Sequence, residues 1–80
     1  MISQKAIHIS QARKMLDSGQ PVELTVVRLK NGSLIRYENA VSLRYDYYKG
    51  TRSIKMLKSG QIRTIHDVCI TGIDDYDVYL

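Results

Sequence analysis

The stretch VELTVVRLKNGSLIRYE, residues 22–38, decides the fold of this chain. Two β-rich runs with alternating side chains enclose Asn31-Gly32. This dipeptide is a strong hairpin signal, because a two-residue hairpin turn needs positive φ at both positions. The stretch therefore predicts an antiparallel hairpin. Its first strand is expected to change its buried face midway, as at a bulge, since its apolar residues are Val22, Leu24 and Val26 followed by Val27 and Leu29.

Upstream of this hairpin, ISQARKMLDSGQP predicts a short helix over residues 10–19. Ser10 can cap its start, Gly19 can take the left-handed position after its end, and Pro21 stops it. Its apolar stripe must pack against the sheet, because a helix of about two turns is not stable alone. Residues 1–9 are an extension whose structure the pattern does not decide.

Downstream, NAVSLRYDYYKGTRSIKML predicts a second hairpin around Lys49-Gly50, in which Arg44 faces Lys55. A long run then reaches Ile73, a polar tip follows at Asp74-Asp75, and a closing strand ends the chain. Residues 22–80 are thus expected to form a bent antiparallel sheet of five to six strands or a small barrel. The fold class is α+β, mainly β.

The length and composition indicate one globular domain over residues 1–80. The chain has 80 residues, of which 44% are apolar and 25% charged, enough for one small core. The longest apolar run, Val68-Cys69-Ile70, is far too short for a membrane span or a signal peptide, so a cytoplasmic protein is expected. The single cysteine is expected to be a buried hydrophobe.

Charge is segregated along the chain. Residues 28–63 hold nine basic side chains against Glu38 and Asp46, a balance of +7, whereas the last seven residues carry −3. Segregated positive charge is typical of proteins that bind polyanions. If Lys49-Gly50 is a two-residue turn, the outward face gathers cations and one ring, which suit single-stranded nucleic acid. The candidate nucleic-acid-binding residues are Arg44, Tyr48, Lys49, Lys55 and Arg63.

Two plainer interpretations of the same residues stay open. Arg44 and Lys55 can splay into solvent while Tyr48 covers the sheet edge with its ring. The positive charge can also serve only solubility, with a partner bound elsewhere.

Other chemistry finds little support in the sequence. His8, His66 and Cys69 have no known metal-ligand spacing, and the segment Asp74–Asp77 lacks the Gly and distal Glu of a calcium loop. There is no phosphate-binding glycine loop and no nucleophile elbow. We therefore expect no enzyme activity, no catalytic residue, no metal and no cofactor.

Two resemblances add to this reading. The run VELTVVRLKNGSLIRYENAVSLRYDYY resembles the first motif of Sm-like proteins, and GQIRTIHDVCITGI is similar to the second. The resemblance covers about residues 11–73 and implies a five-stranded barrel that assembles into rings through edge strands and binds RNA. The chain departs from that family at Tyr37-Glu38, where the family has Gly, and at Arg44 and Tyr47, near its base-binding Asp and Asn.

The segments SGQP and SGQIRTIHDVCITGI, with the final VYL, also resemble short uncharacterised proteins of Bacteroides-type bacteria and their mobile elements. That resemblance implies only a bacterial accessory protein of phage or transposon origin, with no assigned activity.

The sequence thus predicts a small non-enzymatic binding module for single-stranded DNA or RNA. The alternative is a protein-interaction or assembly subunit that uses the last strand, YDVYL, as an exposed edge. In a homo-oligomer, the acidic segment Asp74–Asp77 of one copy would meet the basic hairpin of the next. No membrane and no small-molecule substrate is expected as a partner.

Overall fold

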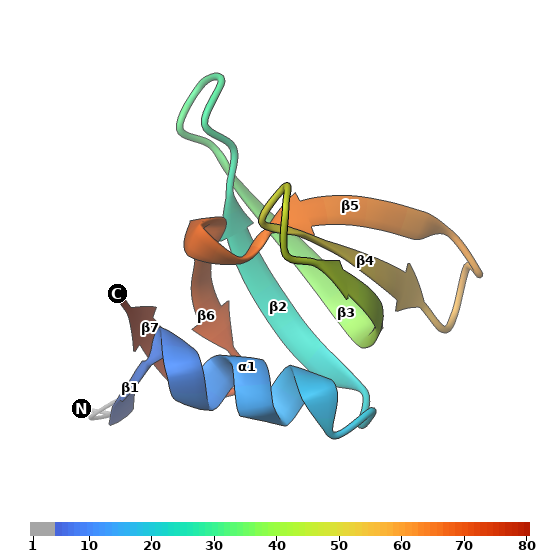
Figure 1. The fold of residues 1–80 in the computed structure, drawn as a ribbon, viewed down its shortest axis with the longest axis horizontal. Coiled ribbons are helices and arrows are strands. Elements are labelled where there is room, and N and C mark those ends of the chain that lie inside the picture. Colours follow the sequence, from blue (N-terminus) through green and yellow to red (C-terminus); the bar gives the residue numbers. More distant parts are fainter. Residues whose placement is uncertain (1–4) are drawn as a thin grey trace.

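A computed structural model describes residues 5–80, and its strands form one open mixed sheet in the order β1-β7-β6-β2-β3-β4-β5 (Figure 1). All neighbouring strands are antiparallel except β1 and β7. The α+β, mainly β prediction is confirmed, with one strand more than expected. The elements are β1 (Lys5–His8), α1 (Ile9–Asp17), β2 (Val22–Val27), β3 (Leu34–Asp46), β4 (Thr51–Met56), β5 (Ile62–His66), the 3-10 turn η1 (Asp67–Cys69), β6 (Ile70–Ile73) and β7 (Tyr76–Tyr79).

The predicted helix is confirmed as α1, but its cap differs. His8 is the N-cap, and its imidazole accepts a hydrogen bond from the backbone N–H of Ser10. The His8 backbone N–H donates in turn to Oε1 of Gln11, which completes a capping box. Gly19 follows the helix with a φ of 80°, as expected of a left-handed C-terminal residue. Figure 1 shows α1 lying across one end of the sheet.

The chain before α1 forms β1, a short strand parallel to β7. Residues 5–8 of the undecided extension therefore belong to the sheet, while residues 1–4 lie outside the described part of the chain. The last strand is consequently not an exposed edge: β7 pairs with β6 on one side and with β1 on the other. That prediction is wrong because β1 comes from the far end of the sequence, a pairing without a local signal.

Strand β3 gives the sheet its bend. Its first half pairs with β2 and its second half with β4, and Ala40 has partners on both sides. The pairing shifts by one residue between Tyr37 and Ala40, where Asn39 has a φ of 49°. Such a bulge bends the strand and increases its twist. The irregularity expected midway along β2 is present, because its pairing with β6 shifts by one residue between Thr25 and Val26. The expected change of buried face is wrong: Val22, Leu24 and Val26 stay buried on one face, and Leu29 is exposed in the loop after β2.

Both predicted hairpins are present, but their loops are longer than two residues. In each loop a glycine N–H donates to the carbonyl four residues earlier: Gly32 to Arg28 at 2.7 Å and Gly50 to Asp46 at 2.8 Å. These two glycines have φ values of 73° and 67°, whereas Asn31 and Lys49 do not have positive φ. The two-residue hairpin turns, types I′ and II′, both need positive φ at their first position, which Asn31 and Lys49 lack, so both hairpins use the longer loop.

The core lies between α1 and the concave side of the sheet. The buried apolar residues are Ala12, Leu16, Val22, Leu24, Val26, Ala40, Ile54, Ile65, Cys69, Ile70 and Ile73. The expectation that Cys69 is buried is confirmed. Within residues 5–80, no helix has the length and apolar character needed to cross a membrane.

Candidate functional site

The β3–β4–β5 part of the sheet has two chemically different faces. We call the side that carries Ile54 and Ile65 toward the core the inner face, and the opposite side the outer face. In an antiparallel pair, residues directly opposite each other project to the same face. The register therefore assigns each charged side chain of these strands to one face.

The inner face holds a buried ion pair between Arg52 of β4 and Asp67 of η1. Only 2% of Arg52 and 1% of Asp67 is exposed. The guanidinium donates twice to the carboxylate, from Nε to Oδ1 at 2.9 Å and from Nη2 to Oδ2 at 3.0 Å. Its Nη1 also donates to Asp17 at 2.9 Å and to Ser42 at 2.8 Å. Four hydrogen bonds thus hold Arg52 in place.

Helix α1 is tied to this pair through Arg13. Its Nε donates to Asp67 Oδ2 at 3.0 Å, and its Nη2 donates to the Tyr45 hydroxyl. The guanidinium carbons of Arg13 and Arg52 lie 4.8 and 5.0 Å from the centre of the Tyr45 ring. Distances of this size allow cation–π attraction. The cluster joins the helix, β3, β4 and η1.

The acids of the cluster keep its cations charged. The hydrogen bond to Asp67 is the main cause that raises the pKa of Arg13. Burial lowers the pKa of Arg52, but its hydrogen bonds with Asp67 and Asp17 and their negative charges raise it by more, so the pKa lies above its usual range. Both side chains are therefore cations at neutral pH.

This cluster is structural rather than a binding site. In the described part of the chain, no buried side-chain nitrogen or oxygen lacks a hydrogen-bond partner. A ligand would have to displace bonds that already exist. This cluster was not predicted from the sequence, although one signal was present: Arg52 and Ile54 alternate with Ser53 in TRSIKM, so Arg52 falls on the apolar side of its strand.

The outer face carries polar rows that cross the three strands. Arg44 of β3 lies opposite Ser53 of β4, which lies opposite Thr64 of β5. A one-residue bulge at Leu43 sets this row, because Ser42 pairs with Ile54 while Arg44 pairs with Ser53. Without it, Arg44 would lie on the inner face. The bulge is thus what turns Arg44 outward.

The predicted opposition of Arg44 and Lys55 is wrong. Lys55 pairs with Val41, because the loop over residues 47–50 and the bulge move the register. In the observed register Val41 lies on the outer face and Leu43 is exposed. Arg44 and Lys55 nevertheless both lie on the outer face. The longer loop shifts the register near Arg44 by two residues, and an even shift keeps each side chain on its predicted face.

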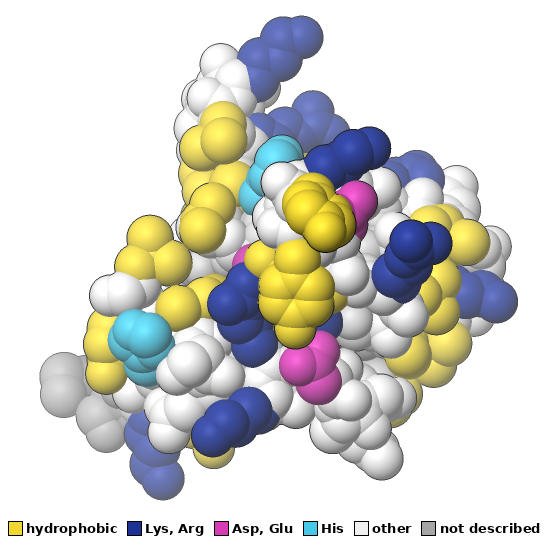
Figure 2. All heavy atoms as spheres, viewed as in Figure 1, with side chains coloured by type: hydrophobic (Ala, Val, Ile, Leu, Met, Phe, Trp, Pro, Cys, Tyr) yellow, Lys and Arg dark blue, Asp and Glu magenta, His cyan; other side chains and the backbone are white. Residues whose placement is uncertain are grey.

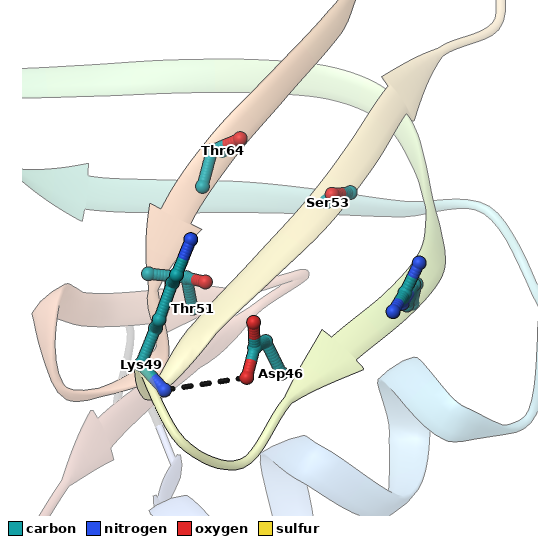
Figure 3. Close-up of a pocket in the computed structure, with 6 residues that line it drawn as sticks. Asp46, Lys49, Thr51, Ser53 and Thr64 are labelled. Carbon is teal, nitrogen blue, oxygen red and sulfur yellow. Dashed lines mark hydrogen bonds between the residues drawn. The ribbon is translucent and has the colours of Figure 1, made fainter.

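A shallow depression opens on the outer face (Figure 3). It has a volume of about 330 Å³, and every residue that lines it is polar or charged: Arg44, Asp46, Lys49, Thr51, Ser53 and Thr64. Figure 3 shows the Lys49 side chain reaching past Thr51 in the direction of Thr64. Asp46 Oδ1 accepts the backbone N–H groups of Tyr48 and Lys49, at 3.0 and 3.3 Å, and so holds the loop.

Four of the five predicted binding residues lie on this face or at its end. Arg44 and Lys49 line the depression, Lys55 projects beside it from β4, and Tyr48 is exposed in the adjoining loop. Arg63 is separate: it pairs with Ile54 and so belongs to the inner side, where it donates to Gln61 Oε1 at 2.8 Å. The sequence pattern did not predict the hydroxyl groups between the cations.

The His, Cys and Asp side chains considered as metal ligands do not come together in the described part of the structure. Glu23 N–H donates to Asp74 Oδ1 at 3.0 Å, and Asp74 N–H donates to the Glu23 carbonyl, which ties the β6–β7 turn to β2. His8 caps α1, and Cys69 is part of the core. Over residues 5–80, no three His, Cys, Asp or Glu side chains are grouped as metal ligands.

No protein-family model, no curated protein and no solved structure matches this chain.

Proposed function

We propose that this protein binds single-stranded nucleic acid on the outer face of β3, β4 and β5. The observation that carries the proposal is the set of cations on that face. Among residues 5–80, no acid forms an ion pair with Arg44, Lys49 or Lys55, whereas Arg13, Arg36 and Arg52 are all paired. Free cations on one surface can neutralise phosphates and release counterions.

An exposed aromatic ring in the loop at the end of this face supports the proposal. Tyr48 is fully exposed and its loop also carries Lys49, whereas the neighbouring Tyr47 ring packs edge-on against Tyr45 of the inner-face cluster, with 4.9 Å between the ring centres. Bases stack on such rings with little sequence preference. Figure 2 shows dark blue Lys and Arg side chains distributed around the visible surface, with few magenta acids among them.

The direct test is a fluorescence-anisotropy titration with labelled single-stranded DNA and RNA at ~50 and ~200 mM salt. If Arg44, Lys49 and Lys55 together neutralise at least two phosphates, the salt slope is about −1.4 or steeper, so affinity should fall about 7-fold or more over this range. The double variant Arg44→Glu/Lys55→Glu should abolish binding.

A matched control keeps the net charge equal. Lys14→Glu/Lys30→Glu also reverses two exposed cations, but these lie on α1 and in the β2–β3 loop. The control should retain most of the affinity. Equal losses in the two variants would mean that net charge, and not the outer face, governs binding.

A second candidate function is protein assembly through β5. This strand ends the sheet and pairs only with β4 among the described residues, and its Ile62 is 55% exposed. An uncovered strand edge can pair with a strand of another molecule. Sedimentation that shows a monomer at all concentrations would exclude self-association through this edge.

A further inference from the structure

The depression on the outer face has features that specify its ligand more closely than charge alone. Most pockets that hold small organic ligands are lined mainly by apolar and aromatic side chains. This depression has none, and its volume of about 330 Å³ is at the lower end of such pockets. Its ligand should therefore be small, polar and open to solvent on one side.

The arrangement of donors favours an anion with several oxygen atoms. Arg44 lies on β3 and Thr64 on β5, with Ser53 of β4 between them, so the backbones of Arg44 and Thr64 are roughly 10 Å apart. Lys49 approaches from the loop (Figure 3). A guanidinium donates in a fixed fork, an ammonium acts as a point charge, and hydroxyls donate singly, a combination that fits tetrahedral phosphate oxygens.

The one acid in the depression does not remove this preference. Asp46 uses Oδ1 to accept two backbone N–H groups of its own loop. Arg44 and Lys49 together outweigh its single negative charge. The depression therefore keeps a net positive charge.

We propose that this depression binds one phosphodiester group of a single strand, with Arg44 and Lys49 as charge partners and Ser53 and Thr64 as hydroxyl donors. The proposal rests on the proposed function and deepens it. The adjoining nucleotide would then lie beside the loop, where Tyr48 offers its ring for stacking. The hydroxyl row gives the strand a fixed register on the sheet.

Two double variants separate this site from general attraction. Ser53→Ala/Thr64→Val removes hydroxyls and no charge, so it should weaken binding of a single-stranded oligonucleotide about 5-fold or more while the salt slope stays unchanged. Arg44→Gln/Lys49→Gln should weaken binding and also make the slope shallower by about 0.7, because these two cations share one phosphate. Thr71→Val, an exposed hydroxyl loss on β6, is the control and should bind like the wild type.

A second measurement uses inorganic phosphate as the probe. In an NMR titration of the full chain, millimolar phosphate should shift the amide signals of Thr51, Ser53 and Thr64, and Arg44→Gln/Lys49→Gln should abolish these shifts. A phosphate response in a protein that binds no oligonucleotide would indicate a free phosphoryl ligand and overturn the assignment to a strand.

The failures of the two proposals are distinguishable. If Ser53→Ala/Thr64→Val binds the oligonucleotide as the wild type does while Arg44→Gln/Lys49→Gln does not, the outer face still binds nucleic acid but this phosphate site is wrong. If neither the oligonucleotide nor phosphate binds the wild-type protein, both proposals are wrong.

Discussion

The two faces of the β3–β4 hairpin hold basic side chains in opposite environments. On the inner face, Arg52 is buried and makes four hydrogen bonds to three partners. On the outer face, Arg44 and Lys55 stand exposed and form no ion pair within residues 5–80. A buried charge must be paired because leaving it alone in the interior is costly, whereas an exposed cation has no such need. The inner cations therefore serve the fold, and the outer cations are available to a partner.

The largest effect on stability is expected at Asp67, on the inner face. Asp67→Asn removes the buried counter-charge of Arg52 and leaves only the exposed carboxylate of Asp17 beside it, so it should lower the free energy of unfolding by about 3 kcal/mol. A domain of this length is stable by only ~4–12 kcal/mol, so this loss would remove a quarter or more of the stability. Urea denaturation followed by circular dichroism measures the loss.

The double variant Arg52→Met/Asp67→Leu tests whether the unpaired charge, and not the loss of the Asp67 side chain itself, causes the instability. Apolar side chains of similar size can replace a buried ion pair at little cost. The double variant should therefore unfold within about 2 kcal/mol of the wild type, although it alters more atoms than Asp67→Asn. A double variant as unstable as the single one would contradict the view that the unpaired charge causes the damage.

On the outer face the largest effect should fall on binding and leave stability unchanged. Tyr48→Ala removes a fully exposed ring and should weaken single-strand binding by about 1–3 kcal/mol, since this is the usual contribution of one stacked base. Its free energy of unfolding should change by no more than ~0.5 kcal/mol. Anisotropy and urea titrations of the same sample measure both quantities.

Tyr48→Phe is the matched control, because it keeps the ring and loses only the hydroxyl. It should bind as the wild type does. If Tyr48→Ala keeps full affinity, the ring takes no part in binding and the outer face acts through charge alone.

Local signals in the sequence were sufficient for the elements but not for their alignment. Gly19, Gly32 and Gly50 all occupy positive-φ positions at the ends of the helix or in the hairpin loops, as their neighbours in sequence indicate. Loop length and bulges were not predictable in this way. A bulge at Leu43 or Asn39 costs little locally and has no fixed sequence signature, yet it changes the partner of every residue beyond it.

Contacts between segments distant in the sequence could not be predicted either. The pairing of β1 with β7 joins Lys5 to Tyr76, and the Arg52–Asp67 pair spans a hairpin and a turn. Such contacts follow from how the whole sheet packs, whereas periodicity reports only on neighbours in sequence. At the candidate site, the outward positions of Arg44 and Lys55 were predicted. The hydroxyl row of Ser53 and Thr64 and the position of Arg63 could be found only from the pairing register of the strands.

The smallest predicted effect is a gain of affinity at Asp46. This residue is the one acid in the depression, and an exposed charge typically changes a neighbouring interaction by ~0.2–1 kcal/mol. Asp46→Asn keeps an oxygen that can accept the Tyr48 and Lys49 N–H groups, so the loop should hold its shape. Single-strand affinity at ~100 mM salt should therefore rise about 1.5- to 5-fold. Asp75→Asn, which removes an acid from the distant β6–β7 turn, should leave the affinity unchanged. A gain of the same size in both variants would trace the effect to net charge, whereas a gain at Asp46 alone would show that the bound anion lies in the depression between Arg44 and Lys49.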